Sequence, residues 1–228
     1  MAIPWQVLER SETADGALEL RRRGEDDFLV CLAGRVLMNS RESRSERALA
    51  TSACARLAGR PEPRLLVGGL GMGLTLRAAL DVLPPGARVS VAELNPVMAD
   101  WCRGPLAALN ARACDDPRVE IVFENVTHTI ARSRNLDGIL LDLYEGPHGR
   151  TPRKDPVYGN AALQRTRVAL APGGVFAVWS EEPDAAFEAR LRKACFEVAR
   201  ERPGRGGRRH AVTIGIRPVH QGSDRLAR

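Results

Sequence analysis

Short apolar segments alternate with amphipathic segments from about residue 46 to residue 216. The apolar segments have the length and the side chains of strands that are buried on both faces, and the segments between them have the apolar spacing of helices. The expected strands are 65–69, 89–93, 119–123, 138–143, 175–179, 196–200 and 211–216, and the expected helices are 46–58, 74–83, 96–109, 126–134, 160–170 and 183–194. This alternation predicts a doubly wound, mostly parallel α/β sheet of seven strands with helices on both faces, which is a Rossmann-like arrangement.

A small antiparallel β segment is expected ahead of this pattern, over residues 17–38. Its apolar runs, 28–32 and 36–38, are interrupted by Gly34, and the turn-forming residues 24–27 precede them. We therefore divide the chain into an N-terminal β segment over 1–45, an α/β domain over 46–218 and a basic tail over 219–228.

Several residues predict where the helices begin. Ser45 is the expected N-cap of the first helix, and Gly59 follows its end. Asn95 is the expected N-cap of the third helix, with Pro96 at its first position.

The composition indicates a globular protein rather than a membrane protein. Hydrophobic residues make up 44% of the chain, and no apolar run approaches the roughly 20 residues that span a bilayer. The N-terminus lacks the basic and apolar stretches of a signal peptide, so a cytoplasmic location is expected. The five cysteines and four histidines show no metal-ligand spacing, so we expect reduced, mostly buried thiols and no metal site.

The net charge of +6 is concentrated at one end of the chain. Residues 200–228 contain eight arginines and two acidic residues, which accounts for all of it. The arginines of 205–209 could contact nucleic acid, but no aromatic side chains lie among them to stack on bases. A solvated loop is the favoured interpretation, and neither nucleic acid nor a membrane is an expected partner.

A glycine-rich turn and an acidic residue carry the clearest chemical signal. Gly69, Gly71 and Gly73 follow the first strand of the domain, and Glu93 ends the next strand. Glycines let the backbone approach a ligand with free N–H groups at a helix N-terminus, and the carboxylate can accept hydrogen bonds from both ribose hydroxyls. A nucleoside site is therefore predicted, with a tight connection that binds no ligand as the alternative.

The spacing of the glycines favours one class of nucleoside. The third glycine comes one residue too early for the dinucleotide motif, and no lysine followed by serine or threonine completes a P-loop. Adenosyl sulfonium compounds are therefore favoured over nicotinamide cofactors.

Asn125 and Val126 follow the third strand, close to the expected crevice beyond the carboxyl ends of the strands. The amide of Asn125 offers a donor and an acceptor, which suits adenine, although Asn125 is also a natural N-cap for the helix that follows. Leu94, next to Glu93, and Val126 are the remaining residues that are predicted to contact the nucleoside.

The end of the fourth strand is the predicted reaction centre. Asp142, Tyr144 and Glu145 place two carboxylates and a phenol at the edge of the crevice. Displacement at a carbon beside a positively charged sulfur needs an amine that loses a proton, and a carboxylate can orient the amine and accept that proton. The alternative is that Asp142 only caps the strand and Tyr144 packs on the sheet. The loop 146–159 is either a lid or a surface connection.

Together these residues make the chain similar, over about 17–217, to the polyamine aminopropyltransferases, which are the spermidine and spermine synthases of polyamine biosynthesis. The resemblance implies the fold of class I methyltransferases and a transferase activity. Glu93 matches the ribose-binding acid, and Asn125 stands where an aspartate usually contacts adenine. Asp142 matches the catalytic aspartate of the family's Asp-Ser-Ser-Asp-Pro motif, and Glu145 its second, amine-binding aspartate. The resemblance also implies a homodimer or tetramer contact through the N-terminal segment.

Two departures from the family pattern bear on the donor and the acceptor. Gly71 stands where the family has an aspartate that holds the amine of decarboxylated S-adenosylmethionine. Of the family's Tyr-His-Glu signature before the first helix, Glu46 is retained. The first hypothesis is transfer of an aminopropyl group from S-adenosylmethionine or its decarboxylated form to a small-molecule amine. The others are an S-adenosylmethionine-dependent methyltransferase and a non-catalytic nucleoside-binding scaffold.

Overall fold

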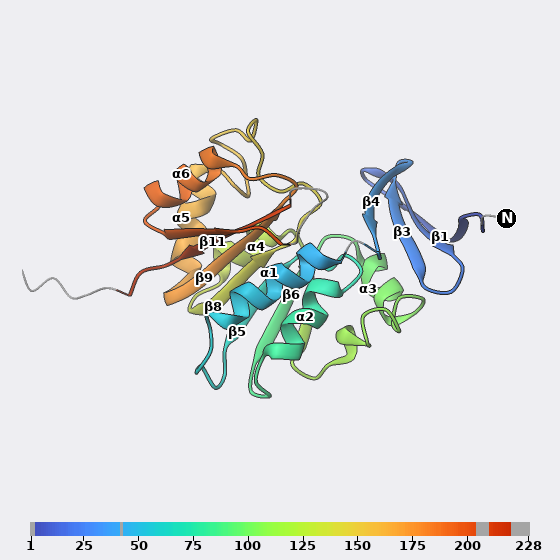
Figure 1. Cartoon of the computed structure of the whole chain (residues 1–228), viewed down its shortest axis with the longest axis horizontal. Helices are drawn as coiled ribbons and strands as arrows, with labels where there is room; N and C mark the ends of the chain where they lie inside the picture. The colour runs from blue at the N-terminus through green and yellow to red at the C-terminus, as the bar shows by residue number, and fades with distance from the viewer. Residues whose placement is uncertain (1–2, 42, 204–209, 220–228) are drawn as a thin grey trace, which may run out of the picture.

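The computed structural model describes residues 3–41, 43–203 and 210–219. Within these ranges, seven strands form the main sheet in the order β10-β11-β9-β8-β5-β6-β7 (Figure 1). Their bounds are β5 Arg64–Gly68, β6 Arg88–Glu93, β7 Val119–Phe123, β8 Leu136–Leu141, β9 Leu170–Ser180, β10 Glu197–Glu201 and β11 Ala211–Ile216. β11 pairs antiparallel with both β9 and β10, and the other pairs are parallel. The predicted doubly wound sheet is confirmed, whereas the basic segment 205–209 and residues 220–228 of the predicted tail lie outside the described residues.

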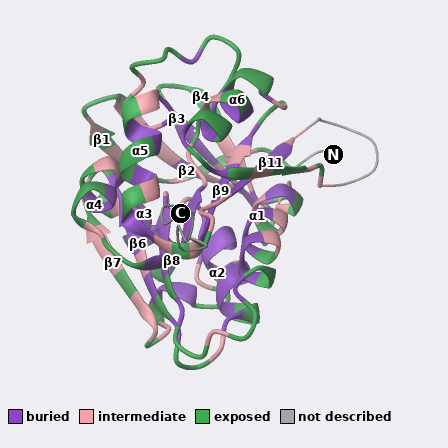
Figure 2. Ribbon diagram, turned by 90° about the vertical axis from the view of Figure 1, so that its left-hand side faces the viewer, coloured by how far each residue is buried: buried purple, intermediate pink, exposed green. Residues whose placement is uncertain are grey.

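Two hydrophobic clusters show how the helices cover both faces of this sheet. Alternate strand residues belong to different clusters, with Val67 and Leu140 in one and Leu66 and Ile139 in the other. The first cluster includes residues of α1 Arg44–Ala55, α2 Leu74–Val82 and α3 Pro96–Arg103, and the second includes residues of α4 Val126–Arg132, α5 Asn160–Ala169 and α6 Ala185–Lys193. The buried residues accordingly lie between the helices and the sheet, while the outer sides of the helices are exposed (Figure 2).

A separate antiparallel sheet precedes α1 (Figure 1). Its strands, in sequential order, are β1 Gln6–Thr13, β2 Gly16–Arg23, β3 Asp27–Leu32 and β4 Arg35–Asn39. The first strand was not predicted, because none of its residues is buried and its sequence carries no apolar stripe. Leu18 and Val30 of this sheet belong to the same hydrophobic cluster as Leu70 and Met72 of the glycine-rich turn. The sheet therefore packs beside the predicted site, while the domain division stays a prediction.

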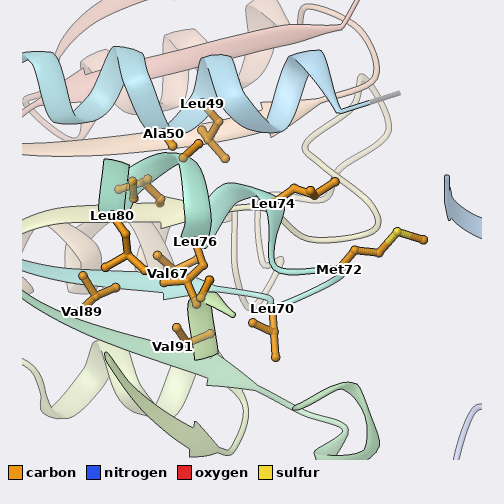
Figure 3. Close-up of a cluster of buried hydrophobic side chains, with 14 of the residues drawn as sticks. Leu49, Ala50, Val67, Leu70, Met72, Leu74, Leu76, Leu80, Val89 and Val91 are labelled. Carbon is orange, nitrogen blue, oxygen red and sulfur yellow. The ribbon is translucent and has the colours of Figure 1, made fainter. Parts of the chain in front are cut away.

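The glycine-rich turn is supported from several sides by buried side chains (Figure 3). Leu49 of α1 and Leu76 of α2 are fully buried, as is Val67 at the end of β5. Such close packing resists displacement, since any movement opens cavities between the side chains. The turn is consequently held in one place relative to the strands on either side.

Several helix boundaries differ from the predictions, including the end of α1, which lies at Ala55 rather than at residue 58. Ser43, rather than Ser45, precedes α1, and Ser45 is buried in the first turn of that helix. α3 ends at Arg103, well before residue 109, because the backbone of Gly104 leaves the helical region with φ −100° and ψ −110°. Asn95 precedes α3 as predicted but makes no side-chain capping hydrogen bond.

Four of the cysteines are buried and Cys195 is exposed, and all five are free thiols. In the part of the chain that the structure describes, no group of three or more metal-ligating side chains gathers. The described helices are all too short or too polar to span a membrane.

Candidate active site

Two cavities adjoin each other where β5, β6 and β8 end. The Glu93 cavity has a volume of about 300 Å³, and its wall includes Gly69, Gly71, Glu93, Leu94, Asn125 and Val126. The Glu46 cavity has a volume of about 230 Å³, and its wall includes Glu46, Asp142, Tyr144, Trp179, Glu181 and His210. Both are lined by Leu37, Met38, Gly71, Asp142, Leu143 and Tyr144. The shared wall makes Asp142 and Tyr144 accessible from either side.

The carboxylate of Glu93 is buried and held in a fixed orientation. Only 7% of the residue is exposed. Its Oε2 accepts a hydrogen bond from the Leu70 N–H at 2.9 Å, and its Oε1 accepts one from the Asn95 N–H at 2.8 Å. Each carboxylate oxygen has a second lone pair. The group can therefore accept further hydrogen bonds from a diol while the backbone keeps it aligned.

Two N–H groups of the glycine-rich turn bond to backbone carbonyls of the protein. The Gly69 N–H donates to the Ala92 carbonyl and the Gly73 N–H donates to the Leu70 carbonyl, both at 2.9 Å. These two N–H groups are therefore engaged within the protein, and the prediction of free N–H groups rests on the others of the turn, such as that of Gly71, which lines both cavities. Gly73, with φ +80°, does not line the Glu93 cavity.

Gly69 has a packing role that brings the reaction centre close to the turn. A Cβ atom at Gly69 would lie 2.5 Å from the carbonyl oxygen of Asp142, and the residue has φ +88°. Both facts require glycine at this position. The ends of β5 and β8 can then approach closely, and the Asp142 N–H donates to the Gly68 carbonyl at 2.9 Å.

Gly71 faces an apolar side chain. A Cβ atom there would lie 3.3 Å from Sδ of Met38, which comes from β4 in the N-terminal sheet. The part of the wall shared by the two cavities thus carries a thioether beside Gly71 and no carboxylate from the turn itself.

Asn125 is the N-cap of α4. Its Oδ1 accepts from the Thr127 N–H at 3.0 Å and from the Thr127 hydroxyl at 2.8 Å. The capping alternative is thereby confirmed, and the side-chain oxygen is engaged by the helix. The predicted acceptor role toward a base is consequently wrong for this oxygen, whereas the NH₂ group of Asn125 can still donate to a ring nitrogen.

The pKa of Asp142, which lines both cavities, is strongly raised. It follows β8 directly, and its Oδ2 accepts a hydrogen bond from the Thr75 hydroxyl at 2.5 Å. Burial, with a further contribution from the nearby charge of Glu46, raises the pKa of Asp142 to about 7, against the opposing effect of the Thr75 hydrogen bond. A carboxylate with this pKa is suited to general base catalysis near neutral pH.

Tyr144 lies in the shared wall beside Asp142, and its hydroxyl accepts a hydrogen bond from Nη2 of Arg35 at 3.2 Å. The guanidinium carbon of Arg35 lies 6.0 Å from the centre of the same ring. Arg35 belongs to β4, so this contact joins the N-terminal sheet to the loop that follows β8.

Glu145 does not join Asp142 and Tyr144. It is exposed and lines a neighbouring cavity, while its backbone carbonyl accepts a hydrogen bond from the Tyr158 hydroxyl at 3.2 Å. Glu145 lines neither of the two cavities that contain Asp142, so its predicted role as a substrate contact stays a prediction.

Glu46 and Glu181 supply the carboxylates that Glu145 does not. Glu46 lies in the first turn of α1, and Glu181 directly follows β9. Trp179 and His210 complete the wall around them. Neither residue was predicted as a site residue from the sequence. Glu181 could have been found because it follows a parallel strand, and Glu46 because it is retained from the family signature.

The loop 146–159 packs against the site. Val157 lines the Glu93 cavity, and Tyr158 is buried with its ring in an edge-to-face contact with Phe187. One end of the loop thus forms part of the wall of the site.

Curated relatives of the chain are polyamine aminopropyltransferases. The protein of that name from Mycobacterium tuberculosis is 29% identical over 182 residues, which cover 78% of this chain and 33% of the relative. The one from Prochlorococcus marinus is 31% identical over 127 residues, covering 54% of this chain and 42% of the relative. Polyamine aminopropyltransferase 2 of Pseudomonas aeruginosa is 30% identical over 151 residues, covering 60% of this chain and 41% of the relative. The chain thus matches less than half the length of each, and no protein-family profile matches it.

Solved structures of spermidine synthases have the same fold. The enzyme from Thermotoga maritima superposes with a TM-score of 0.75 at 19% identity, over 94% of this chain and 74% of the other. A spermidine synthase in complex with the transition-state analogue AdoDATO superposes with a TM-score of 0.72 at 18% identity, over 94% and 73%. The chain is thus similar in sequence to part of the polyamine aminopropyltransferases and has the fold of the spermidine synthases.

Proposed function

We propose that the chain is a spermidine synthase-like transferase. The Glu93 cavity binds the adenosyl group of S-adenosylmethionine or its decarboxylated form, and the Glu46 cavity binds an amine acceptor. An aminopropyl group is transferred from this donor to the amine acceptor. The observation that carries this proposal is the shared wall, since Asp142 lies between a cavity suited to a nucleoside and a cavity lined by acids.

The residues of the Glu93 cavity fit an adenosyl donor. The buried Glu93 carboxylate can accept from the ribose hydroxyls, and the NH₂ group of Asn125 can donate to the base. Apolar side chains such as Val126 and Leu94 line the space around them. When bound, the donor supplies an electrophilic carbon beside its positively charged sulfur.

The residues of the Glu46 cavity fit a cationic amine. Glu46, Asp142 and Glu181 line it, and its described wall contains no lysine or arginine. Such a concentration of carboxylates attracts ammonium groups and orients them. Asp142 accepts a proton from the reacting amine, whose nitrogen lone pair then becomes available for attack on the donor carbon. Tyr144, in the shared wall, positions the same nitrogen.

The arrangement of the glycine-rich turn favours the decarboxylated donor. Intact S-adenosylmethionine carries a carboxylate, for which free N–H groups of the turn would be the natural partners. Three N–H groups of the turn, those of Gly69, Leu70 and Gly73, instead bond within the protein, so fewer donors are left for that carboxylate. The three acids of the adjoining cavity also repel a carboxylate.

A methyltransferase is the second candidate, and the surroundings of Gly71 favour it. No side chain extends from that position to hold the ammonium of an aminopropyl group, and the thioether of Met38 faces it instead. A non-catalytic scaffold is the third candidate and would bind none of the donors.

Calorimetry with three ligands separates the candidates. We expect decarboxylated S-adenosylmethionine to bind about tenfold more tightly than the intact compound, because it avoids one unfavourable carboxylate contact. Methylthioadenosine, which contains only the nucleoside and a thioether, reports the affinity of the Glu93 cavity itself. Tighter binding of the intact donor would favour methyl transfer, and no binding of any of the three would contradict the proposed enzyme.

The rate of transfer is expected to depend on pH through Asp142. Its pKa is raised to about 7, so the carboxyl is protonated and cannot act as a base below that pH. Turnover should therefore fall about tenfold for each pH unit below about 7. The measurement is kcat against pH with decarboxylated S-adenosylmethionine and 1,4-diaminobutane, while binding of methylthioadenosine serves as the control. A rate that stays constant down to about pH 5 would contradict the role of Asp142.

A further inference from the structure

A short chain of hydrogen bonds connects His210 to Glu46. Nδ1 of His210 lies 3.1 Å from the Ser45 Oγ, and this hydroxyl donates to Oε2 of Glu46 at 2.8 Å. Ser45 is buried, with 3% of its surface exposed. The three residues come from α1 and from the residue that precedes β11, and both His210 and Glu46 line the Glu46 cavity.

The chemistry of the acceptor determines the direction of this chain. An ionised carboxylate only accepts hydrogen bonds, so the Ser45 hydroxyl donates its proton to Glu46. The oxygen of Ser45 is then available to accept, and Nδ1 of His210 must carry the proton that it donates. The ring of Trp179 meets the imidazole edge to face, with 5.2 Å between the ring centres, which restricts the orientation of the imidazole.

Glu46 and Asp142 form a pair of acids with different surroundings. Glu46 receives the hydrogen bond from Ser45, which is supported by His210, whereas Asp142 receives one from Thr75. Their mutual repulsion contributes to the raised pKa of Asp142. When two nearby carboxyl groups differ in this way, the better-solvated or better-bonded one stays ionised and the other takes the proton.

Other ionisable groups near the pair are Glu181 and Tyr144, which line the same cavity. The charge of Asp142 also acts on the buried phenol of Tyr158. Burial raises the pKa of Tyr158 well above its ordinary value, so this phenol stays neutral. Among the described residues, Glu181, Tyr144 and His210 are the other titratable groups that line the same cavity as the pair.

We propose that His210, acting through the Ser45 hydroxyl, is a positioning residue that keeps Glu46 ionised and correctly oriented beside Asp142. Glu46 then holds a cationic group of the acceptor, and Asp142 takes the proton of the reacting amine. The inference deepens the proposed function and rests on it, because it assigns different tasks to two acids of the acceptor cavity.

The test compares three variants with the unmodified chain. Ser45→Ala and His210→Ala each interrupt the hydrogen-bond chain, whereas in His210→Asn the side-chain amide can still donate to Ser45. We expect the first two to weaken binding of 1,4-diaminobutane about tenfold, the effect of losing one charge-assisted hydrogen bond. His210→Asn should restore most of that affinity. Thermal unfolding of each variant shows that it is folded.

The pH profile provides a readout that a purely structural role would not change. If Glu46 is protonated more easily, its repulsion of Asp142 decreases and the pKa of Asp142 falls. The acid limb of kcat should therefore move to lower pH in Ser45→Ala and His210→Ala, while KM for the diamine rises. An unchanged acid limb together with unchanged diamine affinity in both variants would overturn the inference.

A measurement without turnover separates this inference from the proposed function. In Glu46→Gln the new amide can donate to Ser45, so the Ser45 hydroxyl is released to donate to His210. The ¹⁵N signals of the imidazole should then show that the proton has moved from Nδ1 to Nε2. If the unmodified chain neither binds the diamine nor transfers a group to it, the proposed function fails. Even in that case, a change in the ¹⁵N signals of the imidazole would support the coupling of His210 to Glu46. Unchanged ¹⁵N signals would overturn it.

Discussion

Replacement of Asp142 by asparagine is expected to lower turnover by two to four orders of magnitude, about the contribution of a well-placed general base. Asparagine retains the shape of aspartate and an oxygen that can accept from the Thr75 hydroxyl. It cannot take a proton from the amine. Affinity for methylthioadenosine should stay nearly unchanged, because Asp142 borders the Glu93 cavity without supplying its ribose contact. Steady-state kinetics and calorimetry on the same preparation measure the two quantities.

Glu145→Gln is the matched control for this experiment. Its carboxylate is exposed and lies outside both cavities, so turnover should change little. Full activity in Asp142→Asn would contradict the base assigned here. A large loss in Glu145→Gln would instead support the sequence-based assignment of Glu145 over its position in the structure.

Removal of the Glu93 carboxylate has the second large expected effect. Glu93→Ala should weaken binding of methylthioadenosine about 100-fold, since hydrogen bonds from both ribose hydroxyls to a charged group are lost. It should also reduce the free energy of unfolding by about 2 kcal/mol, because the buried N–H group of Leu70 and the partly buried one of Asn95 lose their acceptor. Calorimetry measures the first effect and chemical denaturation the second.

Glu93→Gln separates ligand binding from support of the turn. Its amide oxygen can accept from one of the two N–H groups, so this variant should be more stable than Glu93→Ala and should still bind the nucleoside weakly. Unaltered nucleoside affinity in both folded variants would contradict the ribose assignment.

The order of the elements was predictable because each signal is local. The apolar run of β8 and its central place in the sheet follow from side chains that are buried on both faces. Asn125 as the N-cap of α4 follows from one side chain and the backbone two residues on. The first strand, Gln6–Thr13, was missed because its residues have no buried face, and only its pairing with β2 makes it a strand.

The part of the candidate site that lies at the strand ends was also predictable from the sequence. Glu93, Asp142 and Asn125 were found because parallel strands end at one edge of the sheet, where their last residues must meet. Met38, Glu46 and His210 reach the site from the N-terminal sheet, from the start of α1 and from the residue before β11. Their positions depend on how these distant elements pack, which no spacing along the chain expresses.

By itself, the amino-acid sequence determined a doubly wound sheet and the strand ends that carry Glu93 and Asp142, because hydrophobic periodicity and connectivity act over short distances. The tertiary structure decided that the N–H groups of Gly69, Leu70 and Gly73 bond within the protein, and that Glu145 lines a different cavity from Asp142. It also decided that Glu46 adjoins Asp142 and raises its pKa. Hydrogen-bond partners and the electrostatic effect of one acid on another depend on distances in space, and packing alone establishes those distances.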